Sequence, residues 1–259
     1  MTIEIINTLQ LPEKCLLNKK LTKAFFKRNF DLSSSEKNLL DDPSAFISME
    51  WIAAISPGHA NVPAWSSPEV TFEEIQVITV KTSPEALDKV VNKIIDFVQK
   101  YIPYHCLFLV HYVVRFVCNF TKKKINQNDP TKRTMDKKFI TPPFAPNSTQ
   151  SLYYDFLLAL RFSQLVTRSL KDLYDSYVNC FVSLQTAQLN GTFVPRSLER
   201  TNEDILRLEQ IAQLEKDINR LIGTLKSETQ LNKRVELNMT IQKKRTQIEH
   251  LKTNLTTDH

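Results

Sequence analysis

The stretch that decides the fold is FEEIQVITVKT (72–82), which runs directly into SPEALDKVVNKIIDFVQK (83–100). In 72–82, Ile75, Val77, Thr79 and Lys81 would point to one face of a strand, and Glu74, Gln76, Ile78 and Val80 would point to the other. Ser83 then offers a helix N-cap, and Pro84 suits the first helical position. The apolar residues that follow at i, i+3, i+4 and i+7 spacing are Leu87, Val90, Val91, Ile94, Ile95 and Val98. We therefore expect a strand and then a helix that packs on the same sheet.

Working outward, further strands are expected at 46–55, 105–112, 113–124 and 137–144. The stretch 21–30 predicts a short basic amphipathic helix, and Ser33 or Ser34 offers the N-cap of the next one. The order strand, strand, helix, strand, strand, strand indicates an α+β fold, with packed helices on a mixed or antiparallel sheet.

The second half of the chain is predicted to be all-helical. LYYDFLLAL (152–160) forms one short helix, and a longer one ends at Asn190-Gly191, a typical helix stop. Two heptad seams follow, and they comprise Ile211, Leu214, Ile218, Leu221 and Leu225, then Leu237, Ile241, Ile248, Leu251 and Leu255. The seams are out of phase and break within 227–234, which favours a coiled-coil helical hairpin. One long helix with a stutter, in a coiled-coil dimer, is the alternative.

These patterns divide the chain into three parts. We expect an α+β domain at 1–145, a helical segment packing on it at 146–195, and the coiled-coil hairpin at 200–256.

Composition excludes several classes of protein. The chain has only three glycines, isolated from one another, so neither a P-loop nor a Rossmann loop is possible. Its four cysteines are scattered, as is usual for free thiols in a reducing cytosol. No signal peptide is recognisable in residues 1–10, and the apolar run 102–120 contains two histidines and an arginine, which favours a buried hairpin over a membrane span. We expect a cytoplasmic protein that does not contact a membrane.

Positive charge is concentrated in two segments. The net charge is +6, and residues 14–30 alone hold six basic residues and no acidic one. Residues 121–138 hold seven basic residues against Asp129 and Asp136. Such concentrations attract phosphate backbones, although a solvated face is the alternative. The candidate nucleic-acid contacts are Lys19, Lys20, Lys23, Lys27, Arg28, Lys122, Lys123, Lys124, Asn126, Gln127, Lys132 and Arg133.

A nuclease is the main enzymatic alternative. Many restriction nucleases hold Mg²⁺ with an acid on one strand and an acid-x-lysine on the next. Here Thr79-Val80-Lys81 has threonine where that pattern requires a carboxylate. Several acids lie nearby in the sequence, but no spacing assembles them: Asp41, Asp42, Glu50, Glu73 and Glu74. We therefore expect no catalytic residues.

Metal and cofactor sites are not indicated either. His105 and His111 would share one face of a strand but stand about 20 Å apart, too far to bind one zinc ion. We expect Cys106 and Cys118 to pack in the core, and we expect no metal and no cofactor.

Six stretches together resemble one bacterial family, the domain of unknown function 4391. They are LPEKCLLNKK, ISPGHANVPAW, FEEIQVITV, IPYHCLFLV, KKKINQND and SETQLNKRVELNMTIQKKRTQIEHLK, in the family's order and over nearly the whole chain. The resemblance implies a genomic context beside DNA methyltransferases and helicases of restriction or phage-defence operons, which is association and not mechanism. It also implies that a basic residue, an isoleucine and Asn-Gln at 124–127 belong to the family pattern. A structural turn and a ligand contact both remain open for these amides.

The function expected from these observations is that of a non-catalytic accessory subunit in bacterial DNA restriction-modification or antiviral defence. It would bind DNA, a methyltransferase or helicase partner, or both. A Mg²⁺-dependent or degenerate nuclease and a structural adaptor without nucleic-acid contact are the alternatives. The candidate partner-binding residues are Leu214, Ile218, Leu221, Leu237, Ile241 and Ile248.

Overall fold

The computed structural model describes residues 6–129, 132–145 and 151–256. The chain forms two compact units, residues 1–181 and 182–259, and each is described by itself. The three-part division of the chain at 1–145, 146–195 and 200–256 stays a prediction.

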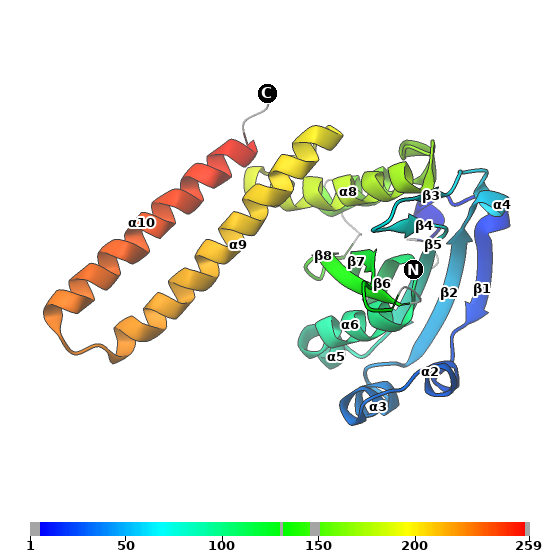
Figure 1. Cartoon of the computed structure of the whole chain (residues 1–259), viewed down its shortest axis with the longest axis horizontal. Coiled ribbons are helices and arrows are strands. Elements are labelled where there is room, and N and C mark those ends of the chain that lie inside the picture. The colour runs from blue at the N-terminus through cyan, green and yellow to red at the C-terminus, as the bar shows by residue number, and fades with distance from the viewer. Residues whose placement is uncertain (1–5, 130–131, 146–150, 257–259) are drawn as a thin grey trace. The chain divides into compact units, whose positions relative to one another are not determined.

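The first unit is built on a six-stranded mixed sheet (Figure 1). In spatial order its strands are β1 (Leu16–Lys20), β2 (Ser48–Ile55), β5 (Ile75–Lys81), β6 (His105–Tyr112), β7 (Arg115–Ile125) and β8 (Arg133–Ile140). Only β5 and β6 are parallel, and every other neighbouring pair is antiparallel. A separate two-stranded sheet pairs β3 (Trp65–Ser66) with β4 (Thr71–Phe72). The predicted α+β fold with a mixed sheet is confirmed.

The parallel pair is joined by the helix that the sequence predicts after Ser83. The Ser83 hydroxyl accepts a hydrogen bond from the Ala86 amide at 3.1 Å, and Pro84 occupies the first turn. The predicted single helix is in fact two, α5 (Pro84–Lys89) and α6 (Val91–Tyr101), because Val90 between them leaves helical geometry at φ −125° and ψ 7°. The apolar spacing continues through this break, so periodicity alone did not reveal it.

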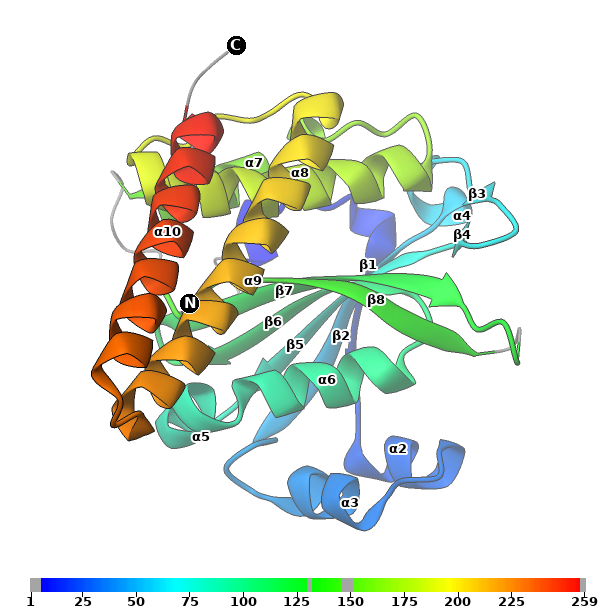
Figure 2. The ribbon, with the colours of Figure 1, turned by 60° about the vertical axis from the view of Figure 1, so that its left-hand side comes forward.

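One face of the sheet, here called the first face, packs against α6 (Figure 2). The large buried core there joins Ile78 and Val80 of β5 to Ile94, Ile95 and Val98 of α6. Two short helices, α2 (Lys23–Asn29) and α3 (Ser34–Asp41), cover the rest of this core with Phe26 and Leu40. Ser33 and Glu36 form a capping box at the start of α3, which explains where that helix begins.

The second face of the sheet packs against α8 (Leu170–Asn190), which follows α7 (Leu152–Ala159). Phe120 of β7 lies 4.9 Å from the ring of Tyr174 and 5.2 Å from that of Tyr177. These aromatic contacts bury the middle of the sheet on this side. The remaining helical turns of the unit are η1 (Glu13–Cys15), α4 (Pro57–Ala60) and η2 (Phe162–Gln164).

Strand β1 is the one strand of the six-stranded sheet that the sequence did not predict, and the short strands β3 and β4 were not predicted either. Its residues, LLNKK, are exposed except for the half-buried Leu17, so they lack the alternation that marks a half-buried strand. A register shift between Leu16 and Lys19 and a positive φ of 49° at Asn18 interrupt its pairing with β2. Irregularity of this kind is common at sheet edges, where it limits pairing with other chains.

The second unit contains the predicted helical hairpin. Helices α9 (Leu198–Ser227) and α10 (Leu231–Thr256) pack on each other, and the break falls within the predicted 227–234 segment. Both seams meet in one buried cluster of Ile211, Ile218, Ile241, Ile248 and Leu255. The alternative of one continuous helix is therefore wrong.

An arginine cluster closes the open end of this hairpin. Arg196 donates to the Leu255 carbonyl at 2.9 Å, and Arg200 donates to the Asn254 carbonyl. Asp204 is fully buried on α9, and both arginines form ion pairs with it, Arg200 at 3.1 Å. An arginine at the carboxyl end of a helix donates hydrogen bonds to the last free carbonyls, and its positive charge interacts favourably with the helix dipole.

The turn between β6 and β7 contains a strained residue. Val113 has φ 50°, a left-handed conformation that is costly for a β-branched side chain, and its side chain is half exposed.

We expect Val113→Gly to raise the free energy of unfolding by about 0.5–1 kcal/mol, because glycine adopts this conformation without strain. Chemical denaturation of the full chain measures the change. Val114→Gly is the matched control, since Val114 has no positive φ and glycine there should only destabilise. A loss of stability in Val113→Gly equal to that of the control would contradict the assignment.

Candidate nucleic-acid interface

A groove of about 870 Å³ lies at the β1–β2–β5 end of the sheet, in the first unit. Its lining combines apolar, amide and charged side chains: Ile6, Asn7, Gln10, Leu11, Leu16, Asn18, Ser48, Glu50, Ile52, Thr79, Lys81 and His111. Pockets of this size and mixed lining are typical of ligand sites.

Strand register brings the polar residues of this groove together. Glu50 of β2 lies directly opposite Thr79 of β5, and Ser48 lies opposite Lys81. His111 of β6 is the partner of Lys81 on the other side. Directly opposed residues point to the same face of a sheet, so these five side chains share one face. The sequence showed no spacing that placed Glu50 beside Thr79, because the long connection between the two strands hides their register.

The groove has the outline of a restriction-nuclease site with one group replaced. Glu50 is an acid on one strand, and Lys81 follows position 79 by two residues on the next. Thr79 presents a hydroxyl where the nuclease pattern requires a carboxylate, so Glu50 is the only carboxylate among the lining residues. Within the described residues, no group of three His, Cys, Asp or Glu side chains is arranged to hold a metal ion. The other acids considered, Asp41, Asp42, Glu73 and Glu74, do not line the groove.

His111 gives the groove a neutral imidazole. Burial, together with the nearby Lys81 ammonium, lowers the pKa of His111 to about 4. At neutral pH the ring is therefore uncharged, and among the described lining residues Lys81 is the only cationic side chain.

The histidine–cysteine group considered for zinc is dispersed. His105 and His111 stand at opposite ends of β6. His105 stacks on Phe72 at 4.4 Å between ring centroids, and burial lowers its pKa to about 3. Cys106 and Cys118 are buried and free, and burial raises the pKa of Cys106 to about 12.

Strand β1 contributes Leu16 and Asn18 to the groove, so its lysines lie beside the lining, whereas α2 covers the first face of the sheet. Lys20 lies opposite Glu50, whereas Lys19 lies opposite Trp51 and so points to the first face. Among the described residues, no carboxylate forms an ion pair with Lys19, Lys20 or Arg28, and this surface keeps its positive charge. Lys23 begins α2 and likewise has no such ion pair, while Lys27 pairs with Asp41 at 2.6 Å.

The second basic segment is paired in part with its own acids. Lys122 and Lys124 both face Asp136 on β8, at 3.9 Å and 3.2 Å. Lys132 pairs with Asp129 at 3.0 Å. The density of positive charge that the sequence suggests is therefore lower at the surface of this segment.

Arg133 and the two amides of this segment have separate positions. Arg133 donates to the Thr71 hydroxyl at 3.2 Å. The Asn126 side chain accepts hydrogen bonds from the amides of Asn128 and Asp129, at 2.8 Å and 3.2 Å, which makes it a structural turn residue. Gln127 is exposed. Of the two readings left open for these amides, the turn describes Asn126.

Lys123 is a buried structural residue and is not on the surface. Its side chain is 1% exposed, and its Nζ donates to the carbonyls of Ile102 at 2.5 Å and Tyr104 at 2.8 Å. The expectation that Lys123 presents its charge to a polyanion is therefore corrected. Alternation on β7 places Lys123 on the opposite face from Lys122 and Lys124, a signal that the sequence contained.

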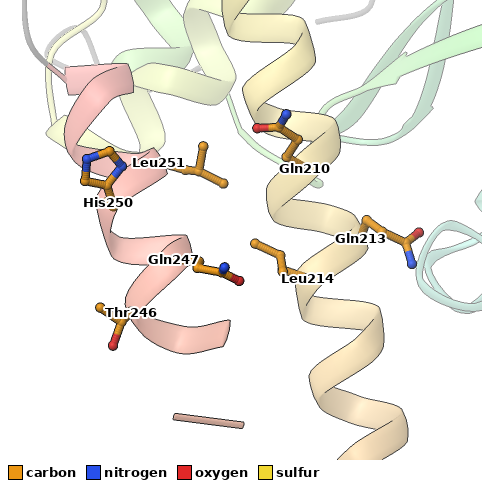
Figure 3. A pocket seen from close by; sticks show the side chains of 7 residues that line it. All are labelled: Gln210, Gln213, Leu214, Thr246, Gln247, His250 and Leu251. Carbon is orange, nitrogen blue, oxygen red and sulfur yellow. The ribbon is translucent and has the colours of Figure 1, made fainter. Parts of the chain in front are cut away.

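The candidate partner-binding residues also divide into two groups. Ile218, Ile241 and Ile248 are buried inside the hairpin, and so they are not available to another chain in this conformation. Leu214, Leu221 and Leu237 are only partly buried. Leu214 and Leu251 form the floor of a second groove of about 650 Å³ between α9 and α10, and glutamine, threonine and histidine side chains form its walls (Figure 3).

The fold and the groove define an α+β protein with a polar, basic-edged site on its sheet and a separate helical hairpin. The chain belongs to the family described as "Domain of unknown function (DUF4391)", whose model matches residues 9–248. The resemblance found in the sequence is thereby confirmed. No curated protein and no solved structure matches the chain. None of the described helices is long and apolar enough to span a membrane.

Burial of Lys123 predicts a specific dependence of stability on pH. Burial lowers the pKa of Lys123 to about 7 in the folded protein, against about 10.4 for an exposed lysine in the unfolded chain. At a pH between these two pKa values, the unfolded chain therefore binds more protons than the folded protein. The free energy of unfolding should therefore rise with pH from 7 to 8.5, by up to about 1.4 kcal/mol per pH unit from this residue.

Lys123→Met should remove that rise, although it lowers stability overall because two buried carbonyls lose their donor. Denaturation of both proteins at pH 7.0, 7.5, 8.0 and 8.5 measures the difference, and comparing the two proteins cancels the ionisation of the unfolded thiols, which contributes equally to both. Parallel curves for the two proteins would contradict the lowered pKa.

Proposed function

We propose that this protein is a non-catalytic accessory subunit of a bacterial DNA restriction-modification or anti-phage defence system. In this proposal the first unit binds DNA and the hairpin docks a DNA methyltransferase or helicase. The genomic context implied by the family resemblance motivates the system and the class of partner. The interface residues are chosen from the structure.

The observation that carries the DNA contact is the group of unneutralised cations on β1 and α2. Lys19, Lys20 and Arg28 are exposed and have no ion pair with the described carboxylates. The 122–138 segment, in contrast, holds Asp136 between two of its lysines. Because cations already paired with carboxylates gain less from a phosphate, we assign the principal DNA contact to β1 and α2.

The absence of catalysis in this proposal rests on Thr79. A hydroxyl in place of a carboxylate leaves Glu50 as the one carboxylate that the described lining residues offer to Mg²⁺. Lys81 would then serve to bind a phosphate group rather than to stabilise charge during its cleavage.

The partner contact is assigned to the partly buried leucines of the hairpin. Leu214 and Leu251 lie on the floor of the groove between the two helices (Figure 3). An amphipathic helix laid into such a groove would cover both leucines, which is a common mode of helix recognition.

The DNA assignment predicts a contrast between two double variants of equal charge. Lys19→Gln/Lys20→Gln should weaken duplex binding and reduce the slope of log K against log salt by about 2, since each lysine that contacts a phosphate contributes about 1. Lys122→Gln/Lys124→Gln removes the same charge and should leave the slope unchanged. Fluorescence anisotropy with a labelled duplex, from 50 to 200 mM salt, gives both slopes.

The opposite ranking would move the DNA contact to 122–138. Equal effects would mean that only net charge matters. If the wild-type protein shows no salt-sensitive binding but captures a methyltransferase or helicase, the protein is a structural adaptor without nucleic-acid contact.

A Mg²⁺-dependent nuclease is the second candidate, and the pairing of Glu50 with Thr79 beside Lys81 favours it. Under the main proposal, pure protein leaves supercoiled and single-stranded DNA intact in Mg²⁺ or Mn²⁺. Agarose gels measure this directly. Cleavage that Glu50→Gln abolishes and Lys122→Gln/Lys124→Gln retains would establish the nuclease instead.

A further inference from the structure

The groove at the β1–β2–β5 end of the sheet differs chemically from a surface that follows a nucleic-acid backbone. A surface that tracks several phosphates needs several cations, yet Lys81 is the only cationic side chain among the twelve lining residues. The other cations of this region, on β1 and α2, do not line it. The groove is therefore suited to one phosphate group and not to a row of them.

The polar and apolar parts of the groove lie at different ends. Lys81 is paired with Ser48 of β2, and Leu16 is paired with Ala53 of the same strand. Ser48 and Ala53 are five positions apart on β2, which is about 17 Å at 3.3 Å per residue. Glu50 lies between them, so a phosphate is attracted to the Lys81 end and repelled from the middle.

The apolar end is equipped with amides. Asn7, Gln10 and Asn18 line the groove together with Leu16 and Ile52. Amide side chains form paired hydrogen bonds with base edges, and an apolar floor accommodates the flat base. The carboxylate of Glu50 is placed to accept a hydrogen bond from a sugar hydroxyl or an exocyclic amine.

Backbone strain is also found here. Gln10 and Asn18 both have positive φ values, 47° and 49°, and both line this groove. In the described part of the chain only two other non-glycine residues share this conformation. Asparagine adopts this conformation at little cost, so the strain lies at Gln10, and the two conformations fix the main chain beside two of the three amides.

We propose that this groove binds a single unpaired nucleotide unit, with its phosphate on Lys81 and its base among Leu16, Ile52 and the amides. Two ligands present one phosphate and one unpaired base: a free nucleoside monophosphate and the unpaired phosphorylated end of a nucleic-acid strand. The choice of ligand class rests on the nucleic-acid contact proposed above. Side chains hold the phosphate, which accounts for a nucleotide site in a chain without a glycine-rich loop.

Titration calorimetry of the full chain tests this with 5′-deoxynucleoside monophosphates, the matching nucleosides and inorganic phosphate as probes. The monophosphates should bind at least about tenfold tighter than the nucleosides, because only the monophosphates make a charge-assisted contact with Lys81. Lys81→Met should abolish that difference. Asn18→Gly keeps the positive φ but removes an amide, and should weaken nucleosides and monophosphates alike.

Lys93→Met is the matched control for charge, since Lys93 is exposed on α6, which covers the first face of the sheet. It should bind every probe as the wild type does. A second arm compares a duplex carrying a 5′-phosphorylated single-stranded overhang with the same duplex made blunt. Preference for the overhang assigns the strand end, and binding of monophosphates without that preference assigns a free nucleotide.

Equal binding of nucleosides and monophosphates would overturn the role of Lys81. The inference fails as a whole if no monophosphate binds at 10 mM and the overhang gives no advantage. Salt-sensitive binding of the blunt duplex, measured in parallel, tests the proposed DNA contact independently of the nucleotide site. If it persists while both nucleotide arms fail, the proposed function stands without this site.

Discussion

The parallel pairing of β5 with β6 is the constraint on which the rest of the first unit depends. Antiparallel strands can be joined by a tight turn, but parallel ones require a crossover, which here is α5 and α6. That crossover buries the first face of the sheet and fixes β5 between β2 and β6. The register of β5 then determines which residues can meet in the groove, because a slip by one residue would turn Thr79 and Lys81 to the α6 side.

The sequence predicted this centre well because its signals are strong and local. The strand predicted from the alternation in 72–82 and the helix start at Ser83 are confirmed, whereas the apolar spacing of 87–98 is helical but spans two helices, α5 and α6. The hairpin was equally accessible, since two heptad seams out of phase require a break between them. Strand β1 was missed because an exposed polar edge strand has no periodic burial to detect.

The groove could not be predicted in the same way. Its residues come from four separate stretches of the chain, and the pairing of Glu50 with Thr79 is a matter of sheet register. The ion pairs of Lys122 and Lys124 with Asp136 were hidden for the same reason, since they cross from β7 to β8. Charge counted along the sequence thus gave both basic segments similar weight, although three lysines of the second segment pair with Asp129 and Asp136. Lys123 is the exception, since strand alternation alone would have turned it away from its neighbours.

The arginines at the open end of the hairpin bind main-chain carbonyls, those of Asn254 and Leu255. Any residue supplies such an acceptor, so substitutions at 254 would leave the closure intact, whereas loss of the last turn would remove both acceptors at once. The match to the family model ends at 248, before this turn. Closure of the hairpin by these arginines therefore depends on the presence of the last turn and not on the identity of residue 254, and a chain shortened to residue 248 would lose both acceptors together with the buried side chain of Leu255.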